Sequence, residues 1–288
     1  MTPRRTSPTS RITWENVLLL ARRIMGEYPP RSVTLRQVHY RCAAAGAIPN
    51  TTSAYKRLSS LIAQERRAGS FPDLIDSTRE VHRPQAFADV ADMLRCMPDS
   101  FRLDRRRGQG VNLYVAAEKD TLRVQFTGWL EDYGIPVVIA RGFSSQSYVQ
   151  DVAAAVRADG RDAVLLYVGD LDASGEDIER DWLERTACWD RVERVALNMA
   201  QVREREIPAA VGKRTDSRWP AFAARHGLDV RYPVQWEVEA LPPEELRQLV
   251  MAAVHVHFAR AVWESVLGDE EEQRVQLRRF LARWRSTG

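Results

Sequence analysis

The chain of 288 residues is poor in cysteine. Its three cysteines, Cys42, Cys96 and Cys188, lie far apart and form no CxxC pair. This scarcity excludes a disulfide framework and argues against a structural zinc site, because both need several closely spaced cysteines. We therefore expect an apolar core to hold the fold together, and a content of 44% apolar residues is sufficient for one.

Long apolar runs are also missing. No stretch approaches the roughly 20 apolar residues that a membrane-spanning helix needs. The opening segment MTPRRTSPTSR contains arginines, but no apolar signal core follows it. The sequence therefore predicts a cytoplasmic protein without membrane contact. It contains no GxxxxGK[ST] loop, so ATP binding of that kind is not expected.

Lysine is scarce, and the basic residues are unevenly distributed. Only three of the 42 basic residues are lysines. Residues 1–110 hold 19 Lys/Arg and 10 Asp/Glu, a net charge of +9, whereas residues 111–288 hold 23 and 29, a net charge of −6. This asymmetry favours a polyanion-binding module followed by a part that uses carboxylates. For any single arginine-rich run, a solvated helix face remains the alternative.

The basic half reads as three short helices. Apolar spacing predicts helices within residues 12–28, 35–46 and 49–69, with Thr34 as the N-cap of the second. The extended segment 70–84 follows, as in a winged helix, whose third helix enters the DNA major groove. We expect residues 1–11 to be a basic flexible arm and residues 12–84 to be a winged-helix domain. The third helix offers four side chains for phosphates: Lys56, Arg57, Arg66 and Arg67.

A tyrosine on the second predicted helix lies away from the apolar face. At 100° per residue, Leu35, Val38 and Cys42 share one face, and Tyr40 falls about opposite it, one turn after Arg36. A tyrosine beside an arginine is available for chemistry. The alternative is that Tyr40 packs against another helix or hydrogen-bonds to a phosphate.

The acidic half alternates strands and helices. Unbroken apolar strands separated by helices indicate a parallel sheet that is covered on both faces. We expect a helical linker over residues 85–110, an α/β domain over 111–243 and C-terminal helices over 244–288. The predicted strands lie within residues 111–117, 135–142, 163–170 and 192–198.

Acidic residues follow two of these strands. Asp170 and Asp172 end the third strand in GDLDASG, and Glu118 follows the first. Ligands of open parallel sheets bind at the carboxyl ends of the strands, and carboxylates are ligands that Mg²⁺ prefers. The sequence therefore predicts a magnesium or manganese site formed by Glu118, Asp170 and Asp172. The alternative is that the aspartates cap the next helix.

A glutamate after the first strand and a DxD after the third resemble the Toprim domain of topoisomerases, primases and some nucleases. TLRQVHY, residues 34–40, is similar to the tyrosine motif of the topoisomerase VI A subunit and its double-strand-break relatives. Further segments resemble the small stand-alone members of that superfamily, the Mini-A proteins, over nearly the whole chain: VHYRCAAAGAIPNTTSAYKRL, AEKDTL, RGFSS, TDSRW and WEVEALPPEELRQLV. In place of the aromatic pair usual in the A subunit, this chain has His39 before Tyr40.

The resemblance implies a fold and an activity. It implies a winged helix followed by a Toprim domain, and Mg²⁺-dependent cleavage of double-stranded DNA by a homodimer. Tyr40 would be the nucleophile, assisted by Arg36 and Glu118, and Arg41 and Lys119 would join the DNA contacts. ATP-driven strand passage would need a separate ATPase partner. Two alternatives stay open, namely a Toprim nuclease that does not use Tyr40 and a DNA-binding protein without catalysis.

Overall fold

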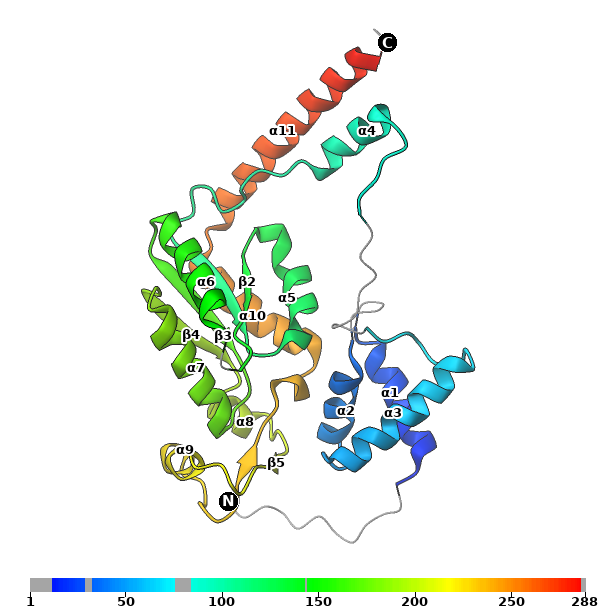
Figure 1. The fold of residues 1–288 in the computed structure, drawn as a ribbon, viewed down its shortest axis with the longest axis vertical. Helices are drawn as coiled ribbons and strands as arrows, with labels where there is room; N and C mark the ends of the chain where they lie inside the picture. Colours follow the sequence, from blue (N-terminus) through cyan, green and yellow to red (C-terminus); the bar gives the residue numbers. More distant parts are fainter. Residues whose placement is uncertain (1–11, 29–32, 76–83, 143, 286–288) are drawn as a thin grey trace.

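The computed structural model describes residues 12–28, 33–75, 84–142 and 144–285. Its first part is a group of three helices, α1 (Trp14–Met25), α2 (Leu35–Ala44) and α3 (Thr52–Arg67), as predicted (Figure 1). The Thr34 side chain accepts a hydrogen bond from the Gln37 N–H, and the Gln37 side-chain oxygen accepts one from the Thr34 N–H, so a capping box starts α2. The three helices enclose a small core that includes Val17, Val38 and Leu58.

The chain after α3 returns to the start of α2. The Ile75 N–H donates to the Val33 carbonyl at 2.9 Å. Residues 76–83 of the expected wing and the predicted arm of residues 1–11 lie outside the described residues. Within residues 12–75, the described part contains helices and extended chain but no strand.

The second part is an α/β fold built on a parallel sheet of four strands in the order β2-β1-β3-β4. Strands β1 and β3 occupy the centre, and every residue in both is buried. All four strands were predicted. Their bounds are Asn112–Ala117 for β1, Val137–Ile139 for β2, Ala163–Val168 for β3 and Arg191–Ala196 for β4.

Helices cover both faces of this sheet. Phe126 of α5 (Arg123–Leu130) and Val250 of α10 (Pro243–His257) pack with Val115 and Leu166 on one face. Val149 of α6 (Gln146–Asp159) packs with Leu165 and Tyr167 on the other face. Helix α7 (Ala173–Thr186) contributes Trp182 to the same side. Because successive strand residues point to opposite faces, this double covering explains the continuous apolar runs of β1 and β3.

A segment after the sheet brings the chain back to its carboxyl edge. Strands β5 (Ala210–Val211) and β6 (Val234–Gln235) form a small antiparallel ladder, and the next residue, Trp236, pairs with Leu171 just after β3. The 3₁₀ turn η3 (Val238–Ala240) then packs against α2. The remaining short elements are η1 (Asp120–Leu122), η2 (Glu131–Tyr133), α8 (Met199–Glu204) and α9 (Trp219–His226).

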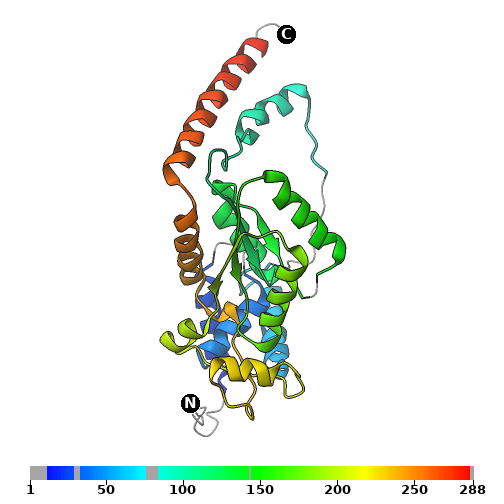
Figure 2. The same ribbon diagram turned by 90° about the vertical axis from the view of Figure 1, so that its left-hand side faces the viewer.

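Two helices form an arm that extends from the sheet. Helix α11 (Arg260–Arg285) continues from α10 along one side of the molecule, and α4 (Val90–Ser100) packs against it (Figures 1 and 2). Although α11 has 26 residues, charges interrupt its apolar positions. None of the helices in the described ranges is long and apolar enough to cross a membrane.

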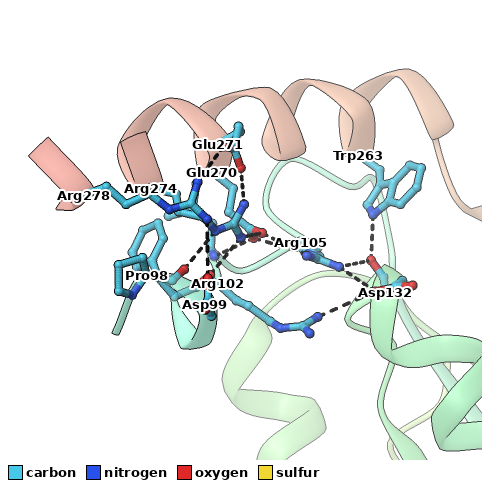
Figure 3. Close-up of polar contacts among 12 residues, drawn as sticks. Pro98, Asp99, Arg102, Arg105, Asp132, Trp263, Glu270, Glu271, Arg274 and Arg278 are labelled. Carbon is cyan, nitrogen blue, oxygen red and sulfur yellow. Dashed lines mark hydrogen bonds and ion pairs between the residues drawn. The ribbon is translucent and has the colours of Figure 1, made fainter. Parts of the chain in front are cut away.

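A buried carboxylate fixes the base of this arm (Figure 3). Glu270 of α11 accepts hydrogen bonds from the Arg105 side chain at 2.9 Å, from the Leu103 N–H at 3.0 Å and from Arg274 at 2.6 Å. Arg105 also donates to the carbonyl of Asp132 in η2, the turn that follows α5. The hydrogen bonds from Arg105, together with those from the Leu103 N–H and Arg274, lower the pKa of Glu270 to about 2.

We predict that Glu270→Ala lowers the free energy of unfolding by about 3 kcal/mol, because it removes a buried carboxylate and leaves two half-buried arginines without it. A lowered pKa stabilises the fold above the ordinary value of 4.5, and this contribution disappears as the pH falls toward about 2. Denaturant titrations at pH 7 and below pH 4 measure both effects. The control Glu271→Ala removes an exposed partner of Arg274 and should cost under about 1 kcal/mol. Equal losses in the two variants would contradict the assignment.

Candidate active site

Two of the predicted acids meet because their strands are neighbours in the sheet. Ala117, the last residue of β1, pairs with Val168, the last residue of β3. Glu118 follows directly, and its side-chain Oε2 accepts a hydrogen bond from the Asp170 N–H at 2.9 Å. The sequence-based expectation that Glu118 and Asp170 lie together at the carboxyl edge is confirmed by this contact.

Asp172 has the role that the capping alternative assigned to it. It is the N-cap of α7, and its Oδ1 accepts a hydrogen bond from the Gly175 N–H at 2.6 Å. Capping uses one of its oxygens and holds the carboxylate beside Glu118. The cap and the acidic cluster therefore coexist at this residue.

The two glycines of GDLDASG leave room for the Glu118 carboxylate. A Cβ at Gly169 would lie 2.7 Å from Glu118 Oε2. A Cβ at Gly175 would lie 3.2 Å from the same oxygen and 3.4 Å from Asp172 Oδ1. The Gly175 Cβ would also lie 2.8 Å from the Asp170 carbonyl oxygen, and the Gly169 Cβ would lie 2.8 Å from the Tyr167 ring. Contacts this short exclude a side chain at either position. Glu118 and Asp172 are thus packed closely against the backbone of this loop.

This crowding changes the acidity of the site. Burial, together with the charges of Asp170 and Asp172, raises the pKa of Glu118 to about 8. Burial and the Asp170 charge also raise the pKa of Asp172. Carboxylates held together in a poorly solvated place repel each other unless a proton or a cation lies between them. The site therefore favours the binding of positive charge.

Within the chain, that positive charge comes from Lys119. Its Nζ lies 2.8 Å from Asp170 Oδ2 and 3.3 Å from Glu239 Oε2, and it also contacts Glu237. Although burial opposes the charged form, the carboxylates raise the pKa of Lys119 well above its ordinary value. We call Lys119, Asp170, Glu237 and Glu239 the Lys119 cluster. The expected DNA contact of Lys119 is replaced here by a buried ion-pair network.

Glu237 and Glu239 were missed as site residues in the sequence. They lie in the segment WEVEALPP, which carries the resemblance but follows no long strand. Burial and the Asp170 charge raise the pKa of Glu237 to about 7, and burial raises that of Glu239. The one available signal was the pair of acids two residues apart, which repeats the spacing of Asp170 and Asp172.

The donors suit a hard divalent cation, but one of them is engaged elsewhere. Asp170 Oδ1 accepts a hydrogen bond from the Val238 N–H at 2.9 Å, and Oδ2 pairs with Lys119. In the described part of the chain, no group of three His, Cys, Asp or Glu side chains is arranged to hold a metal ion. The Glu118 and Asp172 carboxylates are donors of the kind that such an ion takes, and Asp170 would join them on leaving Lys119.

Tyr40 lies next to the Lys119 cluster. The Lys119 Nζ is 4.9 Å from the centre of the Tyr40 ring, within the range of a cation–π contact. Burial and the Glu237 charge raise the pKa of Tyr40 to about 12, and Lys119 and Arg36 oppose this only in part. Arg36 thus lowers the pKa of Tyr40, as expected, but without a bound phosphate and metal this effect is smaller than that of burial. His39, the altered neighbour, is buried and contacts the Tyr40 and Tyr55 rings.

Two grooves meet at this point. The acid groove, of about 780 Å³, lies between α2, α3 and the carboxyl ends of β1 and β2, and Glu118 and Arg36 line it. The tyrosine groove, of about 1590 Å³, lies between α1, α2 and the β5–β6 ladder, and Tyr40 and Glu237 line it. Tyr40 does not line the acid groove, and Glu118 does not line the tyrosine groove.

The predicted DNA contacts divide into three groups. Arg36 and Arg66 line the acid groove, although Arg66 also pairs with Asp73 at 3.4 Å. Lys56, Arg57 and Arg67 are exposed on α3 but do not line this groove.

Arg41 pairs with Glu27 at 2.9 Å, and its side chain is only 12% exposed. We therefore assign Arg41 a structural role instead of a DNA contact. Arg141, which the sequence reading did not name, joins the groove lining.

We predict that Glu118→Gln stabilises the metal-free protein. The pKa of Glu118 is raised from 4.5 to about 8, so between these pH values the folded protein holds a proton that the unfolded chain releases. The free energy of unfolding therefore falls as the pH rises through this range. Each pKa unit corresponds to about 1.4 kcal/mol, so the gain at pH 8 should be roughly 1–3 kcal/mol. The variant should also lose the Mg²⁺-dependent rise in melting temperature that the wild type shows, because a ligand stabilises the state that binds it.

Thermal melts at pH 5 and pH 8, with and without Mg²⁺, test both statements. The matched control is Glu272→Gln on the exposed face of α11, which should change neither stability nor its metal dependence. A Glu118→Gln variant that is less stable than wild type at pH 8 without metal would show that burial and neighbouring charges do not destabilise the ionised Glu118 carboxylate.

Comparison with known proteins does not assign a function to this site. No protein-family model matches the chain, and no curated protein matches it with significant similarity. The α/β fold with its N-terminal helices and long C-terminal helix is thus established by the structure alone. Function has to be argued from the residues at the carboxyl edge of the sheet.

Proposed function

We propose that the protein is a Mg²⁺- or Mn²⁺-dependent DNA-cleaving enzyme of the topoisomerase VI A type, with a winged helix at residues 12–84 and a Toprim domain at residues 111–243. One observation carries the proposal. The Lys119 ammonium contacts Asp170, from the carboxyl edge of the sheet, and the ring of Tyr40, from the second helix. The two elements that the resemblance links to cleavage therefore lie together in the folded chain.

The basic lining of the acid groove supports DNA as the substrate. Arg36, Arg66 and Arg141 come from three separate segments, α2, α3 and the chain after β2. Side chains of this kind bind phosphates without regard to sequence. The groove leads to Glu118, so a DNA backbone held by these arginines would bring a phosphate to the acids. Lys56, Arg57 and Arg67 would extend the contact along the exposed side of α3.

The metal would be held by Glu118 and Asp172, joined by Asp170. When bound, such an ion stabilises the charge that develops on the scissile phosphate and its leaving 3′ oxygen. Binding requires Asp170 to exchange Lys119 for the metal, because both of its carboxylate oxygens are engaged. Glu237 and Glu239 would keep the released ammonium paired, so that the exchange leaves no isolated buried charge.

Tyr40 is the proposed nucleophile. Its hydroxyl oxygen attacks phosphorus and forms a 5′-phosphotyrosyl bond while the bond to the 3′ oxygen breaks. With a pKa of about 12, the phenol gives up its proton to solvent during the attack and not before it. The leaving 3′ oxygen takes up a proton, which comes from solvent when Glu118 holds the metal. In the alternative in which Asp170 and Asp172 hold the metal, Glu118 would supply the proton, because its pKa of about 8 keeps it protonated near neutrality.

The two grooves favour a reaction between two copies of the chain. A phosphate beside Glu118 lies in the acid groove, whereas Tyr40 opens into the tyrosine groove. A partner copy that offers its acid groove to this tyrosine would bring the reacting groups together. The proposed enzyme is therefore a homodimer. ATP-driven strand passage would need a separate ATPase partner.

A second candidate is a Toprim nuclease, in which metal-activated water replaces the tyrosine. It is favoured by the high pKa of Tyr40 and by the contact of its ring with Lys119, both of which suit a packing role. A DNA-binding protein without catalysis would not need the crowded carboxylates at Glu118 and Asp172. The two enzymes differ in what they leave on the DNA end.

Incubation with supercoiled plasmid and Mg²⁺ or Mn²⁺, stopped by detergent, tests the nucleophile. We expect protein covalently attached to 5′ DNA ends for the wild type. Tyr40→Phe removes only the phenolic oxygen, so it should bind DNA normally and lose both the adduct and cleavage by at least about 1000-fold. The control Tyr232→Phe changes an exposed tyrosine outside both grooves and should cleave as the wild type does.

Two outcomes decide against the transesterase. Wild-type cleavage by Tyr40→Phe with protein-free ends would assign the reaction to the metal-dependent nuclease. Absence of cleavage and adduct in the wild type, together with normal DNA binding, would assign the chain to the non-catalytic binders.

A further inference from the structure

The acid groove has apolar side chains in its lining besides the arginines and Glu118. They come from α2, α3 and the chain after α3: Leu35, Tyr55, Ile62, Ala63, Leu74 and Ile75. Phosphates are bound by charged and polar side chains and by backbone N–H groups, so a site for phosphates alone does not need this lining. The groove therefore suits a ligand that carries both phosphates and apolar faces, as a chain of nucleotides does.

One face of α3 forms much of this lining. It consists of five residues at helical spacing, Tyr55, Ser59, Ile62, Ala63 and Arg66. At 100° per residue they fall within a sector of about 100°, so they form a continuous strip along the helix. The helix rises about 16 Å from Tyr55 to Arg66, which is the length of roughly five nucleotides of one stacked strand. The strip thus begins with an aromatic ring and ends with a guanidinium group.

Tyr55 provides the aromatic ring of this strip. It is half-buried, and the centre of its ring lies 5.4 Å from that of the buried His39 ring, at an interplanar angle of 87°. This packing holds the Tyr55 ring in place, and Tyr55 lines the groove. Aromatic rings in a basic groove are platforms on which the bases of single strands stack. A ring that is already held loses little conformational freedom when a base stacks on it.

The arginines of the groove are available to phosphates of the same ligand. Arg36 and Arg141 are exposed. Arg66 pairs with Asp73 at 3.4 Å, but both side chains are more than a third exposed, so this pair contributes little and a phosphate can replace Asp73. Because Glu118 lines the same groove, a strand bound by these arginines passes the acids.

The size and the lining of the groove favour an unpaired strand over a duplex. Its volume of about 780 Å³ is within the range of pockets that enclose a small ligand. In a duplex the faces of the bases are covered by their neighbours in the stack, so they cannot stack on Tyr55. In an unpaired strand the bases can be splayed out and stacked on an aromatic side chain.

We propose that the acid groove binds one unpaired strand of DNA, with a base stacked on Tyr55 and phosphates on Arg36, Arg66 and Arg141. The preference for an unpaired strand is inferred from the lining, whereas DNA as the ligand rests on the proposed function. A duplex would therefore open over a few nucleotides as the strand to be cut enters the groove. The flanking duplex would stay outside, where Lys56 and Arg67 are exposed on α3.

Binding measured without metal tests the proposal independently of cleavage. Fluorescence anisotropy would compare a labelled oligo-dT of about eight nucleotides with a duplex hairpin that has the same number of phosphates. Tyr55→Leu keeps an apolar side chain beside His39 but removes the aromatic face. It should weaken binding of the single strand about 10-fold and leave binding of the hairpin unchanged.

Two variants serve as controls. Tyr55→Phe keeps the ring and should bind both ligands as the wild type does. Tyr232→Leu removes an exposed tyrosine outside both grooves and should also change neither affinity. Unchanged single-strand affinity in Tyr55→Leu overturns the proposal. An equal loss for both ligands also overturns it, because a missing base platform cannot weaken the binding of a duplex. Equal or tighter binding of the matching oligo-U would assign the groove to RNA and overturn the assignment to DNA.

A photochemical cross-link tests the contact in the unchanged protein. An oligonucleotide that contains 5-iododeoxyuridine should link to Tyr55, in the tryptic peptide that ends at Lys56. No link, or a link to other segments only, contradicts stacking on this ring. The plasmid assay judges the proposed function separately. Loss of the Tyr55 effect with intact cleavage removes only this inference, whereas normal stacking without cleavage or adduct removes only the enzyme.

Discussion

The salt-bridge network around Lys119 is the interaction on which the arrangement of the site depends. One ammonium group joins the end of β1 to Asp170 after β3 and to Glu237 and Glu239 around η3. Because η3 packs against α2, the same network sets where the N-terminal helices lie relative to the sheet. Replacing any one of these charges would leave the others buried without compensation, which is more costly than the loss of an exposed pair. The network therefore connects the sheet to the segment that packs on the N-terminal helices. Its ammonium group also supplies the positive charge that a bound cation would supply.

The sequence predicted those parts of the site that follow from local pattern. Glu118 and Asp170 were expected at one edge because the carboxyl ends of parallel strands share it, whereas their direct contact follows from the strand order, in which β1 and β3 are neighbours. The helix at Tyr40 followed from Thr34 and the apolar spacing after it. What could not be predicted depends on contacts between distant segments. Arg41 pairs with Glu27, which follows the first helix. Lys119 points inward because it pairs with Glu237 and Glu239, which lie more than 100 residues further along the chain.

The acidity of Tyr40 shows the same distinction. The effect of Arg36, one turn away, could be predicted from the helix, but the pKa also depends on burial and on the Glu237 charge, and neither is visible in a helix pattern. Tyr40 lies beside the Lys119 cluster of its own chain, but it lines a different groove from Glu118. A reaction between two copies would therefore join the tyrosine groove of one copy to the acid groove of the other.

The proposed metal site requires that a divalent cation binds between Glu118 and Asp172 and draws Asp170 away from Lys119. Crystals soaked in Mn²⁺ test it directly, because the ion can be located by its anomalous scattering. We expect one strong peak within about 2.5 Å of Glu118 and Asp172 oxygens, with Asp170 turned toward it and Lys119 held by Glu237 and Glu239. No peak there at millimolar Mn²⁺, with Lys119 still paired to Asp170, would contradict the account and make the acids part of a purely structural network.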